Sequence, residues 1–167
     1  MLNLVIGQAI GIVGTIATFI SYQVNTKRQV LFIQPLATLL TCVSYFFLGA
    51  TSGFALNIVC VVRNVLFYYQ KGSSKANTIT AVILAVIMVV LGAFSWQGIV
   101  SLLIIIALAV NTIFLSLPKP QTLRKSIIFT SSLILIYNVF VFSIGGIINE
   151  SIAIISSIIG IIRFKKR

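Results

Sequence analysis

Residues 76–94 read ANTITAVILAVIMVVLGAF, and residues 97–117 read QGIVSLLIIIALAVNTIFLSL. Neither stretch contains a charged side chain, and each is close to the roughly 20 apolar residues that carry an α-helix across a bilayer. A helix satisfies its backbone N–H and C=O groups within the segment, so the hydrocarbon core tolerates it. The two stretches therefore predict neighbouring membrane-spanning helices joined by a short turn.

The rest of the chain has the same character. Hydrophobic residues make up 59% of the 167 residues and charged residues only 8%, whereas soluble domains contain roughly 25% charged residues. A soluble fold of this size has too little interior to bury so much apolar surface. The composition predicts an all-α integral membrane protein whose main partner is the lipid bilayer.

Seven apolar segments follow one another, separated by turns rich in Gly, Ser and Pro. We expect helices at residues 4–23, 29–49, 52–70, 76–94, 97–117, 124–143 and 146–164. Each segment is long enough to span a bilayer, so the sequence predicts seven transmembrane helices.

The formal net charge of +11 is distributed unevenly. Apart from Arg63, every Lys and Arg lies where seven crossings would place it on one side of the membrane. Short cytoplasmic loops carry such an excess of basic residues, so we expect the N-terminus outside and the C-terminus in the cytoplasm. Because long apolar runs separate the basic clusters, we expect no nucleic-acid partner.

The chain also shows an internal duplication. Residues 12–68 align with residues 104–160, at an offset of 92, with nine identities. The matched residues include Tyr45 with Tyr137, Gly53 with Gly145 and Asn57 with Asn149. Two three-helix copies share one orientation only if an extra helix joins them, which predicts a 3+1+3 arrangement of parallel repeats. Its parts are a first repeat at 4–70, a linker helix at 76–94 and a second repeat at 97–164.

Several short motifs make the first half similar to a known family. They are Ser21-Tyr22-Gln23, Leu48-Gly49-Ala50 and Arg63-Asn64. Over residues 7–70 the chain resembles the YgjV-like family of bacterial inner-membrane proteins, and the 3+1+3 architecture resembles the SWEET and PQ-loop (MtN3-like) transporters. The resemblance implies a SWEET-like fold in the bacterial cytoplasmic (inner) membrane. The Pro-Gln pair of PQ-loop repeats is replaced in the first half by Tyr22-Gln23, and Pro120-Gln121 falls in an expected loop.

Arg63 lies near the middle of the segment at residues 52–70, where insertion scales give a charged side chain a cost of about 2.5–3.5 kcal/mol. Such residues generally face the bundle interior or a watery cavity. We interpret Arg63 as lining a solute path, which favours an anionic or zwitterionic solute, or one rich in hydrogen-bond acceptors. The alternative is an arginine that snorkels to the interface or binds backbone carbonyls.

Asn57 and Asn64 are seven residues apart and share a helix face. At the offset of 92 they correspond to Asn149 and Ser156. Amide and hydroxyl groups offer donors and acceptors without net charge, so we place all four on the solute path beside Arg63. The alternative is interhelical hydrogen bonding with a purely structural role.

Three further residues are candidates for a gate. Glu150 is the only acidic residue in the chain and could form an ion pair with Arg63. Tyr45 is expected at the same depth as Asn57, and Tyr137 at the same depth as Asn149, both toward the outer face. The alternative for both tyrosines is the aromatic belt at the membrane interface.

With no His and a single carboxylate, the chain can assemble neither a zinc site nor a paired-carboxylate or Ser-His-Asp mechanism. We therefore expect no enzyme and no cofactor. Proton-driven transport generally uses Asp, Glu or His in the path, so a facilitator is the simpler mechanism. The sequence predicts a small-solute transporter that rocks two three-helix halves. The alternatives are a channel and a non-transport partner or assembly subunit.

Overall fold

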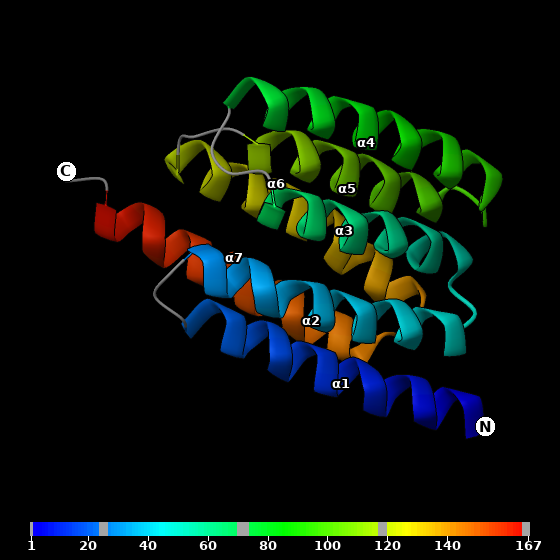
Figure 1. Ribbon diagram of the computed structural model, residues 1–167. Coiled ribbons are helices and arrows are strands. Elements are labelled where there is room, and N and C mark those ends of the chain that lie inside the picture. The colour runs from blue at the N-terminus through cyan, green and yellow to red at the C-terminus, as the bar shows by residue number, and fades with distance from the viewer. Residues whose placement is uncertain (1, 24–26, 70–73, 117–119, 165–167) are drawn as a thin grey trace.

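In the computed structural model, the described residues, 2–23, 27–69, 74–116 and 120–164, form seven α-helices joined by turns (Figure 1). The helices are α1 (Leu2–Gln23), α2 (Lys27–Phe47), α3 (Thr51–Tyr69), α4 (Ser74–Phe94), α5 (Val100–Ser116), α6 (Pro120–Phe140) and α7 (Ile144–Phe164). Each expected segment overlaps one helix, so the prediction of an all-helical chain is confirmed for this part of the protein.

Within the part of the chain that the structure describes, three helical segments are long and apolar enough to cross a bilayer, judged by length and composition. They are Leu2–Ile20, Thr51–Tyr69 and Asn77–Phe94. Three shorter apolar segments lie at Phe32–Phe47, Val100–Ser116 and Ile144–Ile159. Helices capable of spanning a membrane are thus present among the described residues, and the number of crossings stays a prediction.

The start of α6 differs from the sequence-based expectation by four residues. Pro120 is the first residue of the helix, so Pro120-Gln121 lies in its first turn and not in a loop. Proline is favoured at this position, because its missing N–H would have no partner inside the helix and its fixed φ suits a helix start.

The bundle carries large apolar side chains on its outside, and polar side chains are buried inside it beside an apolar core. Phe94 is 87% exposed and Ile99 78% exposed, whereas Thr112 and Asn138 are fully buried. Soluble proteins show the opposite preference, with polar residues mostly exposed. An apolar outer surface, with the polar side chains turned toward the interior, is the pattern expected of a helix bundle in lipid.

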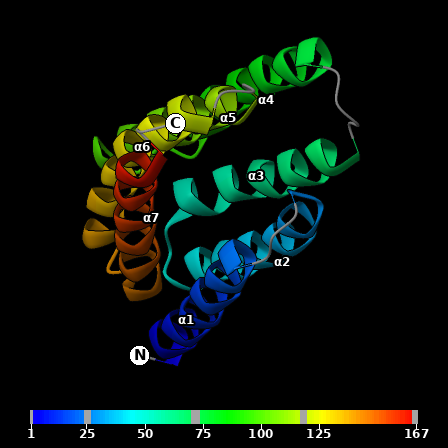
Figure 2. The same cartoon turned by 90° about the vertical axis from the view of Figure 1, so that its left-hand side faces the viewer.

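The helices form two groups of three with one helix at the edge. In the first group α2 packs on α1 and α3, and in the second α6 packs on α5 and α7. The groups meet where α1 packs on α7 and where α3 packs on α5. Helix α4 packs on α3 and α5, and Figure 2 shows it at the edge of the bundle, far from α1. The contacts of α1 with α7 and of α3 with α5 are equivalent by position. Helix α1 corresponds to α5 and α3 corresponds to α7, so the contact of α1 with α7 corresponds to the contact of α5 with α3.

The turn between α2 and α3 and the turn between α6 and α7 have the same backbone hydrogen bonds. Ala50 N–H donates to the Tyr45 carbonyl at 2.9 Å, and Ser143 N–H donates to the Asn138 carbonyl at 2.9 Å. Equivalent residues in the two turns are therefore 93 positions apart. We call the end of the bundle that holds these turns, on the right in Figure 1, the hairpin end.

The two turns also share a residue with a positive φ, at positions that are again 93 residues apart. Gly49 has a φ of 71° and Phe142, 93 residues later, a φ of 54°. Glycine adopts this left-handed conformation freely, whereas it is uncommon for a residue with a side chain. The second turn thus keeps the backbone shape of the first without its glycine.

The spacing of 93 replaces the offset of 92 that residue identities suggested for the last helix. Asn64 is 1% exposed, and Ser157, 93 residues later, is 6% exposed. Ser156, which the offset of 92 matches to Asn64, is exposed. Successive residues of a helix are rotated by roughly 100° about its axis. An alignment that is wrong by one position therefore assigns residues to the wrong face of the helix.

Candidate functional site

Arg63 lies inside the bundle, with 7% of its side chain exposed. Its Nε and Nη2 donate to Asn64 Oδ1 at 3.2 and 3.1 Å. Its Nη1 donates to Thr112 Oγ1 of α5 at 3.0 Å. The guanidinium therefore lies where the two groups of helices meet and points away from the lipid-facing surface.

A third helix joins this cluster through Asn64. The Asn64 Nδ2 donates to Thr38 Oγ1 of α2 at 3.3 Å. Thr112, which accepts from Arg63, donates its own proton to the Leu108 carbonyl at 2.7 Å. We call Arg63, Asn64, Thr38 and Thr112 the arginine centre; every member except Arg63 is uncharged.

The expected ion pair between Arg63 and Glu150 is not formed. Glu150 Oε1 accepts from Asn149 Nδ2 on the same helix at 3.0 Å. Since Glu150 is the only acid in the sequence, no other side chain of this protein can supply a carboxylate to Arg63. Among the described residues the guanidinium contacts uncharged groups alone.

A second polar cluster lies near the hairpin end. Tyr45 and Tyr137 are each 2% exposed, and their rings meet edge to face with centroids 6.0 Å apart. The Tyr45 hydroxyl donates to Asn138 Oδ1 at 2.6 Å. Gly53 N–H donates to the Tyr137 hydroxyl at 3.0 Å. Both tyrosines are thus buried between the groups of helices and do not form part of an aromatic belt on the surface.

The contact between Tyr137 and Gly53 has a structural role as well. Gly53 lies in the first turn of α3, where backbone N–H groups have no partner within the helix. A tyrosine of α6 therefore caps α3. A Cβ atom on Gly53 would lie 2.9 Å from the Tyr137 hydroxyl oxygen, so only glycine leaves room for this approach.

The other predicted path residues are not brought to the arginine centre. Asn57 is 9% exposed, and its Nδ2 donates to the Gly53 carbonyl at 2.8 Å within α3. Asn149 is half-buried on α7 beside Glu150, and Ser156 is exposed. Of the predicted path residues, Asn64 alone contacts Arg63 in the described structure.

A glutamine outside the first group of helices binds the first hairpin turn. Gln97, in the connection between α4 and α5, donates through Nε2 to the Gly49 carbonyl at 2.8 Å. Its Oε1 accepts from Ser52 N–H at 3.4 Å. This N–H also belongs to the first turn of α3, so one side chain binds both the turn and the start of the helix.

Another glutamine binds the second hairpin turn in the same way. Gln8 of α1 donates through Nε2 to the Phe142 carbonyl. Its Oε1 accepts from Ile144 N–H, at the start of α7, at 2.9 Å. We call the two arrangements the glutamine clasps. Gln8 reaches from α1 to the hairpin turn between α6 and α7, and Gln97 reaches from the connection before α5 to the hairpin turn between α2 and α3.

Sequence reasoning missed several of these residues. Thr112 interrupts an apolar run together with Asn111, a signal that was available, but the offset of 92 pairs Thr112 with Ile20. The same offset pairs Gln8 with Val100, so the internal alignment gives no reason to compare Gln8 with Gln97. Their shared role follows only from the way the helices pack.

The described residues contain no group of three or more His, Cys, Asp or Glu side chains that could hold a metal ion. The sequence model of the Imp-YgjV family, described as bacterial inner membrane protein, matches residues 5–167. No curated protein matches the chain, and no solved structure matches it. The family match covers nearly the whole chain and assigns no role to individual residues.

Proposed function

Since the chain belongs to the Imp-YgjV family of bacterial inner membrane proteins, we propose that it is a small-solute transporter of that membrane. In this proposal α1–α3 and α5–α7 are two parallel repeats, and α4 is the linker that gives them the same orientation. The two repeats rock against each other, so that a site between them opens to one side of the membrane at a time.

The observation that carries the proposal is the hydrogen bond between Tyr45 and Asn138. The two residues hold equivalent positions in the hairpin turns, 93 residues apart. Equivalent residues of two copies touch each other only close to the two-fold axis that relates the copies. Parallel-repeat transporters place the substrate path between the halves, along such an axis.

The position of the arginine centre supports a solute path there. Arg63 and Thr112 join α3 to α5, where the two repeats pack on each other. Ionisable side chains within membrane-spanning segments are costly, and they generally mark substrate or ion pathways. A purely structural interface could use apolar side chains at lower cost.

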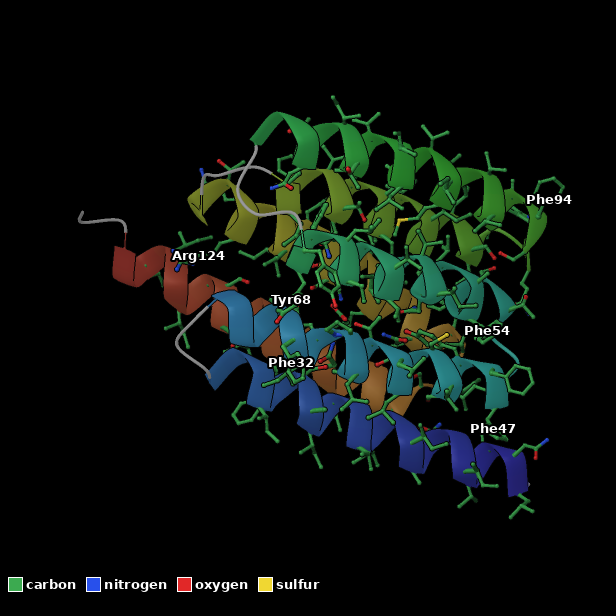
Figure 3. All side chains as sticks on the ribbon, in the orientation of Figure 1. Phe32, Phe47, Phe54, Tyr68, Phe94 and Arg124 are labelled. Carbon is green, nitrogen blue, oxygen red and sulfur yellow. The ribbon has the colours of Figure 1, made fainter. Side chains whose placement is uncertain are left out.

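The glutamine clasps supply the closed end of such a transporter. Both cross between the repeats at the hairpin end, so opening that end breaks four hydrogen bonds, each worth about 0.5–1.5 kcal/mol. Figure 3 shows Arg124 at the end opposite to Phe54 and Phe94. Because basic residues favour the cytoplasmic side, we assign the closed hairpin end to the outside.

Flux measurements in proteoliposomes test the proposal. Radiolabelled acetate, alanine and glucose represent anionic, zwitterionic and neutral solutes, and protein-free liposomes are the control. We expect saturable uptake of a probe, accelerated when the unlabelled probe is loaded inside. Flux that neither saturates nor shows this counterflow would indicate a channel. Absence of flux across a broad panel of such solutes would favour a partner or assembly subunit.

A further inference from the structure

We infer that the arginine centre is a binding site for one small anion with oxygen acceptors, a carboxylate or a similar oxyanion, taken up as a free solute. The inference rests on the proposed function, because the bound anion is the solute that the transporter carries. It narrows the substrate class from small polar solutes to small anions.

The first argument is charge. Arg63 is buried, its partners Asn64 and Thr112 are neutral, and the only acid in the chain, Glu150, is bound by Asn149 on α7. A buried charge without a partner of opposite sign is strongly unfavourable. The sequence contains no second acid that a rearrangement could bring to Arg63, so the compensating charge has to come from outside the protein.

The second argument is the number of free donors. A guanidinium has five N–H groups arranged as a planar fork. Three are used, by Asn64 at Nε and Nη2 and by Thr112 at Nη1. One N–H on Nη1 and one on Nη2 have no acceptor among the described residues. Arginine binds carboxylates through two such N–H groups, and the fork makes this geometry specific.

The remaining contacts hold the guanidinium ready for such a ligand. Asn64 accepts from the Nε and Nη2 edge and is itself fixed by its bond to Thr38. Thr112 is fixed by its bond to Leu108. The orientation of the fork is therefore set by α2, α3 and α5 together, and binding costs little additional ordering of the side chain.

Position and size favour a free solute over a lipid headgroup. Arg63 lies six residues before the end of α3 at Tyr69, about 9 Å along the helix, and is 93% buried. A lipid phosphate at the bilayer surface does not reach this depth without leaving the interface. Met88, whose sulfur lies 3.4 Å from Thr112 Oγ1, makes one side of the centre apolar. A small anion with a single charge fits these surroundings.

Binding of acetate to the full-length protein in phosphatidylcholine nanodiscs tests the inference, with acetamide as the uncharged analogue of the same shape. Isothermal titration should show saturable acetate binding and no acetamide binding. Arg63→Gln should weaken acetate binding by about tenfold or more, because hydrogen bonds to a charged group are lost. Lys125→Gln is the matched control, since it removes one positive charge from an exposed position of α6.

Equal binding of acetate and acetamide would overturn the inference, and so would equal losses in Arg63→Gln and Lys125→Gln. If Arg63→Gln fails to fold, the comparison of acetate with acetamide on the unmodified protein decides the question. Nanodiscs containing phosphatidylglycerol form a further arm. Loss of acetate binding there would identify a lipid headgroup as the occupant and refute the free solute, whereas unchanged binding supports it.

The test separates this inference from the proposed function. A protein that binds acetate but moves no solute into liposomes would refute transport and keep the anion site. A protein that transports alanine or glucose without binding acetate would keep transport and refute the anion site.

Discussion

Gly145 of α7 lies directly on the backbone of Gly11 of α1: a Cβ atom on Gly145 would be 2.4 Å from the Gly11 carbonyl carbon. The obstruction is main chain, which cannot rotate away as a side chain can. Thr15 of α1 also donates to the Gly145 carbonyl at 2.7 Å, so the two helices are tied at this point. The contact between α1 and α7 is one of the places where the three-helix groups pack on each other.

Gly145→Ala should therefore force α1 and α7 apart. Inserting one methyl group into a tightly packed contact costs about 1–3 kcal/mol, and the bond from Thr15 should weaken as well. The free energy of unfolding, measured in mild detergent with increasing denaturant, checks this expectation.

Gly7→Ala is the matched control for Gly145→Ala. The three atoms nearest to a Cβ on Gly7 would be side-chain atoms of Phe47 and Leu48, at 3.1 Å or more. These side chains can adjust, so Gly7→Ala should cost clearly less. Equal losses of stability in the two variants would contradict the close backbone contact between α1 and α7.

Tyr137→Phe tests the cap on α3. The change removes the hydroxyl that accepts from Gly53 N–H and leaves this buried donor without a partner. The expected loss of unfolding free energy is about 1–3 kcal/mol. Tyr69→Phe is the control, because Tyr69 is 74% exposed at the other end of α3. Equal stabilities of the two variants would show that the cap contributes nothing.

The sequence predicts the helices of this protein well because the determining property, a run of about 20 apolar residues, is local. Arg63 and Asn64 could also be singled out locally, since polar groups are costly in such runs. Their partners could not. Contact between Arg63 and Thr112 depends on how α3 and α5 are rotated against each other, and hydropathy alone does not fix this rotation.

The register of the last helix shows the same limit. Tyr45 and Tyr137 are identical residues 92 positions apart, yet the hydrogen bonds of the turns make Asn138 the equivalent of Tyr45. An alignment of identical residue types therefore matched Asn64 with Ser156. Burial instead identifies Ser157 as the residue on the inner face. The turn decides the register, and its backbone conformation at Phe142 is not encoded by a glycine.

The orientation of the protein is predicted from its basic residues. A fluorescent protein fused to the C-terminus should fluoresce, because that terminus is expected in the cytoplasm. Alkaline phosphatase, which matures only outside the cytoplasm, should be inactive at the same position. The opposite pattern of activities would reverse the assignment of the hairpin end to the outside.

Breaking a glutamine clasp should open the hairpin end. Gln8→Ala and Gln97→Ala each remove two hydrogen bonds at the hairpin end, worth about 1–3 kcal/mol, which corresponds to a shift of about 5–150-fold toward the proposed open state. Cys60 is 2% exposed in the buried cluster that joins the two groups of helices. In either variant Cys60 should react faster with a membrane-impermeant maleimide added from the outside.

Cys42 supplies the control for this labelling. It is also 2% exposed, but its thiol donates to the Phe54 carbonyl at 3.4 Å within the first group of helices. Rocking of intact groups should leave it protected. Each thiol is measured in a protein that lacks the other, with Cys42→Ala for Cys60 and Cys60→Ala for Cys42. Adding Gln8→Ala or Gln97→Ala should increase the reactivity of Cys60 alone. Equal gains would indicate general loosening of the bundle instead of opening between the repeats.

The last prediction concerns the absence of coupling between Arg63 and Glu150. Since Arg63 donates to Asn64 and Thr112 while Glu150 accepts from Asn149, neither charge stabilises the other directly. In a double-mutant cycle of unfolding free energies, Arg63→Gln and Glu150→Gln should therefore add within about 0.5 kcal/mol. A coupling energy of several kcal/mol would instead establish the ion pair that the sequence suggested.

Measurements of solute flux should distinguish Arg63 from Glu150 as well. Arg63→Gln should reduce uptake to the level of empty liposomes while the protein stays folded. Glu150→Gln should retain uptake, because a glutamine carbonyl can accept the same bond from Asn149. Uptake that survives Arg63→Gln would remove Arg63 from the solute path.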